Sequence, residues 1–308
     1  MFVINNSFRP VKRRHSLLLV LILFSASATA NCPIPDLTQP PKTVLALNQT
    51  SIENMLRLEL QQNMVATAYL DDTIPAHLAT KMAGIPEIAT SWPSREQVMA
   101  IKPDLIYAGF PSAFGKSTLG TPQWWKKRDT SVLVNPYTCL KSDSPLVWAD
   151  AWQDLHQLAK VFNKQAQATE LELQALSELP ALNSAKKPKV LLLDVYSQQA
   201  QIGACCGGAD LMIRLAGGDN VGESFEGRWA SLSWESVAQQ NPDIIVLATY
   251  TRNSTSAIEA KLKQHPLLSK INAVKHNRII NIPFTATLAS PRIVEGISVL
   301  NSVITQWR

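Results

Sequence analysis

A thirteen-residue pattern occurs twice in this chain, and it constrains the fold more than any other feature. Residues 94–106 read SREQVMAIKPDLI, and residues 233–245 read SWESVAQQNPDII. In each copy a glutamate follows a serine by two positions and precedes a Pro-Asp pair. The copies lie 139 residues apart, which is too far for a short tandem repeat. They therefore indicate one supersecondary unit that is used once in each of two similar domains.

Each copy predicts a helix followed by a strand. Ser94 and Ser233 are suited to cap a helix N-terminus, because a serine side chain accepts a hydrogen bond from an unpaired backbone N–H. Pro103 and Pro242 end the helix, since proline has no N–H to donate and restricts the residue before it. The short apolar runs that follow are typical of buried parallel strands.

The first thirty residues have the pattern of a secretory signal peptide. Four Lys and Arg residues precede the apolar run Leu17–Phe24, and residues 28–30 offer small side chains for cleavage. The apolar run is too short to span a bilayer as a helix. We therefore predict export to the periplasm, with cleavage after Ala30. A lipoprotein anchor at Cys32 is the alternative, although Asn31 stands where lipoprotein processing requires a small residue.

The charge of the chain lies mostly in this leader. Four of the 29 Lys and Arg residues belong to residues 1–30, so that 25 remain against 24 Asp and Glu. A nearly neutral mature protein carries no electrostatic signature of nucleic-acid binding.

Strand and helix patterns alternate on both sides of a long polar segment. Residues 31–144 and residues 181–308 each predict an α/β lobe with a mainly parallel sheet. Residues 145–180 have no Gly or Pro between their two terminal prolines and carry apolar residues at helical spacing. They predict one long α-helix of roughly 50 Å that joins the lobes. A ligand cleft is expected between the lobes, at the carboxyl ends of the strands.

Four cysteines follow the leader, and export makes disulfides possible. Adjacent cysteines pair only in a strained ring, so we expect Cys32 and Cys139 to form the bridge. Cys205 and Cys206 are then either small buried residues beside two glycines or a reactive, ligand-facing pair. We favour the buried interpretation.

Together these features resemble the periplasmic substrate-binding proteins of ABC importers, in the subgroup that carries ferric siderophores, haem and cobalamin. The resemblance extends from Thr43 to the end of the chain. Besides the doubled unit, it includes Ile85-Pro86, the sequence LAGGDNV at 215–221 and ASPR at 289–292. It implies a monomeric protein that captures a small molecule and delivers it to an inner-membrane permease with its ATPase.

The resemblance also implies a role for the repeated glutamates. In that family one glutamate of each lobe docks onto arginines of the permease, and the motif assigns these positions to Glu96 and Glu235. Exposed carboxylates at two separated points select the orientation of a partner and speed encounter. The alternative is that both residues only stabilise their helices through the helix dipole.

Aromatic residues at strand ends and in loops are the candidate ligand contacts. The predicted set is Tyr69, Trp92, Phe110, Tyr196, Trp229 and Tyr250, together with Arg252. Family members that hold cobalamin or haem cover the ligand's planar faces with aromatic loops, and Tyr69, Trp92 and Trp229 resemble those positions. Tyr69 or Tyr250 is a candidate axial ligand for haem. The alternative is that these rings are half-buried packing residues.

Cationic side chains are candidates for contact with ligand carboxylates, namely Lys116, Arg228, Arg252 and Arg292. The histidines after the leader show no paired ligand spacing, so we expect no bare metal site on the protein and no covalent cofactor. A metal would arrive inside an organic complex: a cobalt corrinoid, haem or a ferric siderophore.

Enzyme motifs are missing from the sequence. It has no G-x-S-x-G elbow, no phosphate loop and no recognisable triad, so we expect a binding protein and not an enzyme. Two alternatives stay open. One is a thiol- or metal-dependent redox protein that uses Cys205-Cys206, and the other is a sensor with the same fold that does not serve transport.

Overall fold

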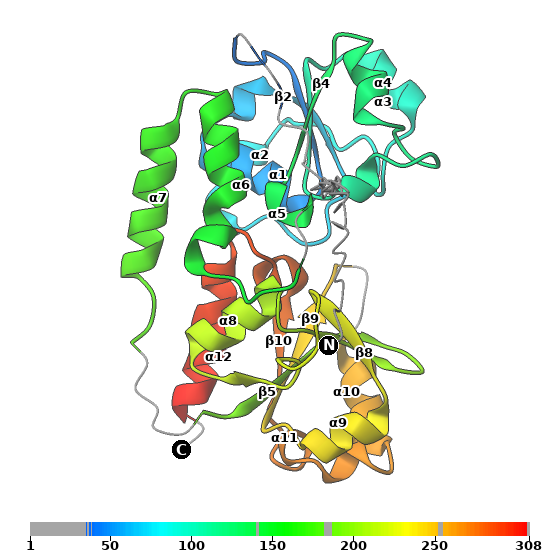
Figure 1. Cartoon of the computed structure of the whole chain (residues 1–308), viewed down its shortest axis with the longest axis vertical. Coiled ribbons are helices and arrows are strands. Elements are labelled where there is room, and N and C mark those ends of the chain that lie inside the picture. Colours follow the sequence, from blue (N-terminus) through cyan, green and yellow to red (C-terminus); the bar gives the residue numbers. More distant parts are fainter. Residues whose placement is uncertain are drawn as a thin grey trace, which may run out of the picture.

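Two lobes stacked along the long axis make up the molecule (Figure 1). The structure, a computed structural model, describes residues 35, 37, 39–139, 142–181, 187–251 and 255–306. The predicted signal peptide, Cys32 and Arg252 lie outside these residues.

The N-terminal lobe is built on a four-stranded parallel sheet of order β2-β1-β3-β4. Every residue of the central strands β1 and β3 is buried, which explains their unbroken apolar sequence. The strands are β1 (Val44–Leu47), β2 (Met64–Ala68), β3 (Leu105–Ala108) and β4 (Ser131–Val134). The helices are α1 (Gln49–Arg57), α2 (Ala76–Met82), α3 (Arg95–Ile101), α4 (Pro122–Lys126) and α5 (Pro136–Cys139).

The C-terminal lobe holds a mixed sheet of order β10-β9-β5-β6-β8, with β7 paired to β5. Its β6 strand runs antiparallel to β5 and β8, and its other pairs are parallel. The strands are β5 (Lys189–Tyr196), β6 (Ala200–Gly203), β7 (Asp219–Asn220), β8 (Trp229–Leu232), β9 (Ile244–Thr249) and β10 (Ile279–Pro283). The helices are α8 (Gly208–Ala216), α9 (Trp234–Gln240), α10 (Thr255–Gln264), α11 (Asn272–Lys275) and α12 (Ile293–Gln306). The prediction of two α/β lobes with mainly parallel sheets is confirmed.

The segment between the lobes differs from the prediction. It forms two helices, α6 (Trp148–Val161) and α7 (Gln165–Ser177), which lie side by side next to the N-terminal lobe (Figure 1). The break falls at Asn163, whose φ of 57° is left-handed and ends an α-helix. Asparagine adopts this conformation more readily than most residues, so the helix stops without a Gly or Pro. The prediction of one long helix that crosses between the lobes is therefore wrong.

The two copies of the repeated pattern adopt the same local structure. Ser94 caps α3 and Ser233 caps α9, each by accepting a hydrogen bond from the backbone N–H three residues later, at 3.2 and 3.1 Å. Each helix ends on a left-handed residue, Lys102 or Asn241. A buried strand, β3 or β9, follows directly. The predicted helix, turn and strand are thus present in both lobes.

A buried ion-pair network connects the lobes. Glu53 on α1 accepts hydrogen bonds from Arg292, just before α12, at 2.9 Å and from Arg57 at 3.2 Å. Arg292 also pairs with Glu295 at 2.9 Å. Glu53 and Arg292 are only 3% and 7% exposed. The largest apolar cluster also includes residues of both lobes, so the lobes meet through a continuous packed interface. Arg292, which the sequence offered as a candidate ligand contact, thus belongs to this interface.

A buried carboxyl group in the N-terminal lobe links stability to pH. Asp154 on α6 accepts hydrogen bonds from the Tyr107 hydroxyl at 2.6 Å and from the Asn54 amide at 3.0 Å. Burial raises the pKa of Asp154 to about 7, although these two hydrogen bonds lower it. Because an unfolded Asp titrates near about 3.9, the folded state holds its proton to higher pH than the unfolded state does. This contribution to stability is present below about pH 4 and is lost as pH rises through about 7.

Asp154→Asn is therefore expected to flatten the pH dependence of unfolding. Between pH 5 and pH 8 the free energy of unfolding of the wild-type protein should fall by about 2 to 3 kcal/mol relative to that of the variant. Only the wild-type protein has a buried carboxyl group at this position that must release its proton as the pH rises. Urea denaturation of both proteins at the two pH values measures this difference. Parallel pH profiles would show that Asp154 is already ionised in the folded protein.

Candidate functional site

A cleft opens between the lobes at the carboxyl ends of the parallel strands. Its larger compartment, of about 520 Å³, takes side chains from both lobes. Four of its lining residues directly follow β1, β2, β9 and β10, which end at one edge of each sheet: Asn48, Tyr69, Tyr250 and Phe284. A smaller compartment of about 300 Å³ adjoins it, and both are lined by Phe110 and Ser112. The two compartments therefore form one cleft.

The wall from the N-terminal lobe carries a pair of rings. Tyr69 and Trp92 meet edge to face, with ring centroids 4.5 Å apart. Tyr69 has a φ of 64°, which is a costly conformation for an aromatic residue. Its backbone N–H donates to the carbonyl of Ala89 at 2.9 Å, which helps to hold this conformation. Backbone strain of this kind concentrates at functional sites, where the surrounding structure fixes a side chain in one position.

The wall from the C-terminal lobe is a row of three stacked rings. Phe284 lies between Tyr250, at a centroid distance of 4.7 Å, and Trp229, at 6.0 Å. The rings deviate from parallel by only 25° and 23°. The row offers a broad apolar surface that spans both compartments. Sequence reasoning missed Phe284, although it follows the last strand just as Tyr250 follows β9.

Carboxyl groups lie beside the larger compartment. Asp71 lines it and accepts a hydrogen bond from the Asn48 amide at 2.6 Å. The Tyr250 hydroxyl donates to Asp194. Burial raises the pKa of Tyr250, and the nearby charge of Asp194 raises it further, so this phenol stays protonated. Burial also raises the pKa of Asp194, against the effect of the Tyr250 hydrogen bond.

A guanidinium group lies in the smaller compartment. Arg228 donates to the backbone carbonyl of Tyr137 at 2.6 Å, and its guanidinium carbon lies 4.6 Å from the centroid of the Tyr137 ring. Among the described residues that line either compartment, Arg228 alone is a lysine or arginine. The cleft is thus polarised, with carboxyl groups at one end and a cation at the other.

The structure brings five of the seven predicted ligand contacts together: Tyr69, Trp92, Phe110, Trp229 and Tyr250. Tyr196 lies elsewhere and packs against Trp234 in the C-terminal lobe, at a centroid distance of 4.4 Å. Neighbouring side chains of a strand point to opposite faces, so Val195 reaches the cleft in its place. Arg252 lies outside the described residues.

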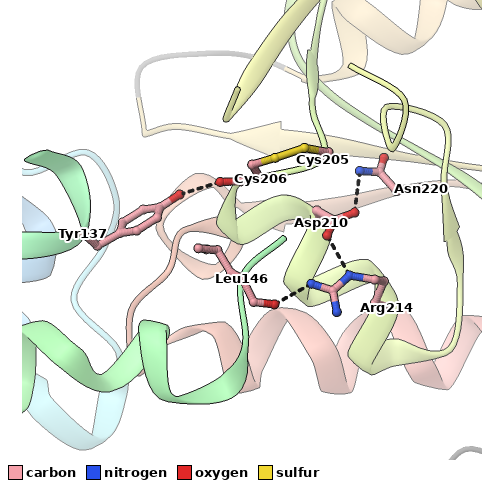
Figure 2. Close-up of a disulfide and its surroundings, with 7 residues drawn as sticks. All are labelled: Tyr137, Leu146, Cys205, Cys206, Asp210, Arg214 and Asn220. Carbon is pink, nitrogen blue, oxygen red and sulfur yellow. Dashed lines mark hydrogen bonds and ion pairs between the residues drawn. A yellow bond between two sulfur atoms is a disulfide. The ribbon is translucent and has the colours of Figure 1, made fainter. Parts of the chain in front are cut away.

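The cysteines differ from the favoured interpretation. Cys205 and Cys206 form a disulfide with each other (Figure 2). The expectation that they are unpaired buried residues is therefore wrong. The predicted bridge between Cys32 and Cys139 involves a residue outside the described part of the chain and stays a prediction.

The described residues contain no group of three or more His, Cys, Asp or Glu side chains placed to hold a metal ion. None of their helices combines the length and the apolar character needed to cross a membrane.

An aromatic cleft between two α/β lobes is the architecture expected of a two-lobed solute-binding protein. The chain belongs to the periplasmic binding protein family, whose family model matches residues 44–286. This family membership agrees with the expectation of a binding protein and not an enzyme.

The individual relatives share only modest sequence identity with this chain. The heme uptake protein IsdE of Staphylococcus aureus is 27% identical over 152 residues, which are 44% of this chain and 50% of IsdE. The chain thus spans about half the length of the curated relatives it matches. A periplasmic binding protein from Veillonella parvula superposes with a TM-score of 0.79 at 25% identity, over 87% of this chain and 92% of that one. An ABC-type Fe3+-hydroxamate transport protein from Saccharomonospora viridis gives 0.72 at 20% identity, over 86% and 94%.

Proposed function

We propose that this chain is the extracytoplasmic solute-binding component of an ABC importer, and that it captures a planar metal complex of the haem type for delivery to the permease. The two aromatic walls of the cleft carry this proposal. A ligand with two broad apolar faces can bury one face against the stacked row and the other against Tyr69 and Trp92. The similarity to IsdE, which is named for heme uptake, supports the same ligand class.

The polarity of the cleft also suits such a ligand. Arg228 can receive a carboxylate from the edge of the complex, because a guanidinium binds carboxylates through two parallel hydrogen bonds. The carboxyl groups near the larger compartment disfavour a polyanionic catecholate siderophore there. They favour, as a second candidate, a cobalamin- or cobinamide-type corrinoid, whose side-chain amides can donate hydrogen bonds to Asp71.

Of the two candidate axial ligands, Tyr69 is the better placed. Iron binds a tyrosine as the phenolate. The Tyr250 hydroxyl already donates to Asp194, and the raised pKa of Tyr250 opposes formation of the phenolate. Tyr69 lies on the opposite wall of the same compartment. We therefore assign the axial contact to Tyr69.

Absorbance titration of the purified protein with haemin tests this assignment. Wild-type protein is expected to bind haemin at micromolar concentration or below and to show the charge-transfer band of an iron phenolate. Tyr69→Phe should remove this band and weaken binding about tenfold to a hundredfold, as expected for the loss of a central contact. Tyr250→Phe is the matched control, because it removes a hydroxyl from the other wall, and it should keep the band.

The titration also separates the ligand classes. Cyanocobalamin and a ferric trihydroxamate are titrated under the same conditions. Binding of cyanocobalamin with no response to haemin would move the assignment to a corrinoid, and preference for the trihydroxamate would move it to a ferric siderophore. Binding of none of the three would refute a metal-complex ligand.

A further inference from the structure

The disulfide between the neighbouring residues Cys205 and Cys206 has no part in the proposed ligand contacts. Cys205 and Cys206 follow β6 and lead directly into α8 (Figure 2). Cys206 is fully buried, whereas Cys205 is partly exposed. A bridge between neighbours closes a ring through their shared peptide bond. Opening the ring therefore releases backbone torsions that the sulfur bridge holds.

The backbone of this turn supports the wall of the cleft. The three successive N–H groups of residues 204–206 donate to carbonyl oxygens of residues 228, 225 and 227, at 3.0 to 3.1 Å. That second segment carries Arg228 and leads into Trp229, and both side chains line the smaller compartment. The conformation of the bridged turn thus helps to set the position of the cation and of one ring of the cleft.

The turn also contacts the opposite lobe and has little room to move. The Tyr137 hydroxyl of α5 donates to the carbonyl of Cys206 at 3.4 Å (Figure 2). Gly207 and Gly208, the next two residues, line the same compartment as Tyr137. A Cβ at Gly208 would overlap the backbone of residues 287–289. We therefore expect a change in the turn to alter the position of residues that line the cleft.

The body of α8 is fixed independently of the sulfur atoms. Asp210 accepts hydrogen bonds from Arg214 at 2.7 Å and from Asn220 at 3.1 Å. Arg214 also donates to the carbonyl of Leu146 at 2.7 Å (Figure 2). None of these contacts involves the sulfur atoms, so we expect them to hold the helix when the bridge is open. Opening of the bridge is thus confined to the turn and to the segment of residues 225–229 that it supports.

We propose that Cys205–Cys206 is a reducible switch that controls how firmly the cleft wall is held, with an extracytoplasmic dithiol as its reaction partner. A thiolate of the dithiol attacks the partly exposed sulfur of Cys205, the S–S bond breaks, and Cys206 leaves as a thiolate and takes up a proton. The second thiolate of the partner then attacks the partner's own sulfur in the mixed disulfide. Cys205 is released and protonated, and the partner is left as a disulfide. Two electrons and two protons have passed to this chain.

The dithiol form is expected to bind ligand more weakly. Its turn samples more conformations, and ligand binding must then order the turn and the segment it supports. The effect on affinity rests on the proposed function, whereas the change in the turn does not. The two effects are measured separately for this reason.

Hydrogen exchange of the mature protein, with and without dithiothreitol, measures the turn itself. Alkylation and mass spectrometry first establish which cysteines are reduced. Reduction is expected to speed exchange of the amides of residues 204–206 by about tenfold, since their hydrogen bonds open more often. The double variant Cys205→Ser/Cys206→Ser should exchange rapidly without reductant and should not respond to it. This variant keeps Cys32 and Cys139, so a response that persisted in it would come from those residues and overturn the switch.

Haemin titration of the same samples measures the cleft. Reduction is expected to weaken haemin binding about three- to tenfold, as expected when a side chain or short loop must be ordered on binding. Faster exchange with unchanged haemin affinity would overturn the claim that the disulfide controls the cleft wall. Unchanged exchange after full reduction would overturn the proposal as a whole. Faster exchange in a protein that binds no haemin in either state would support the switch and refute the haem assignment.

Discussion

Replacement of both Glu96 and Glu235 by arginine is expected to abolish uptake of the ligand by cells while the purified protein keeps its ligand affinity. Both side chains are exposed, one on α3 of the upper lobe and one on α9 of the lower lobe (Figure 1). Hydrogen bonds from its own backbone N–H and from the capping serine lower the pKa of each glutamate. Both therefore present a negative charge at neutral pH. On the proposed docking of these glutamates to arginines of the permease, charge reversal at two separated points would place like charges opposite each other.

Uptake is measured as growth on the ligand as sole metal source, in a strain that carries the variant gene and the importer. Each single substitution is expected to reduce uptake partly. Glu170→Arg is the matched control, because Glu170 is an exposed glutamate on α7, and it should leave uptake intact. Normal uptake with both arginines in place would show that the two glutamates serve only to stabilise their helices. Ligand binding with no dependence of uptake on the gene would favour the sensor alternative.

The second large effect is expected at the interface between the lobes. Glu53→Gln keeps the size of the side chain and removes the charge that Arg292 and Arg57 share. Removal of the buried charge leaves Arg292 with only the more exposed Glu295 as its ionic partner, and we expect a loss of about 3 kcal/mol in the free energy of unfolding. Because Glu53 belongs to one lobe and Arg292 to the other, the lobes should also separate more readily.

Urea denaturation measures the stability, and solution X-ray scattering measures the separation of the lobes. Glu59→Gln is the matched control, since Glu59 pairs with Lys81 at 3.1 Å on the surface of the same lobe. Exposed ion pairs contribute little, so its unfolding curve should match that of the wild type. A Glu53→Gln protein as stable as this control would mean that packing alone holds the lobes together.

Local patterns in the sequence predicted most of the fold. The doubled serine-to-proline unit specified a capped helix and a buried strand, because caps, stops and apolar runs act over a few residues. The break at Asn163 was not predicted, because asparagine is a weaker signal for the end of a helix than Gly or Pro. As a result, one continuous helix was predicted where the chain folds back on itself.

The candidate site was predicted less completely. Tyr69 and Tyr250 were chosen because each was placed at the end of a predicted strand, where parallel sheets bind their ligands. Tyr196 was misplaced by one residue of register, which is enough to turn a strand side chain to the opposite face. Arg228 and Tyr137 lie far apart in the chain, so their contacts cannot be predicted from local sequence patterns. The pairing of Cys205 with Cys206 was rejected in favour of a bridge between distant cysteines.

The turn between α6 and α7 offers a place to attach a reporter. Asn163 is exposed at the end of the helix pair, which packs beside the N-terminal lobe away from the cleft (Figure 1). Exposed loop tips of this kind tolerate inserted domains, because few buried contacts depend on them. A fluorescent domain inserted there, paired with a dye on the C-terminal lobe, would turn the protein into an optical sensor for its own ligand.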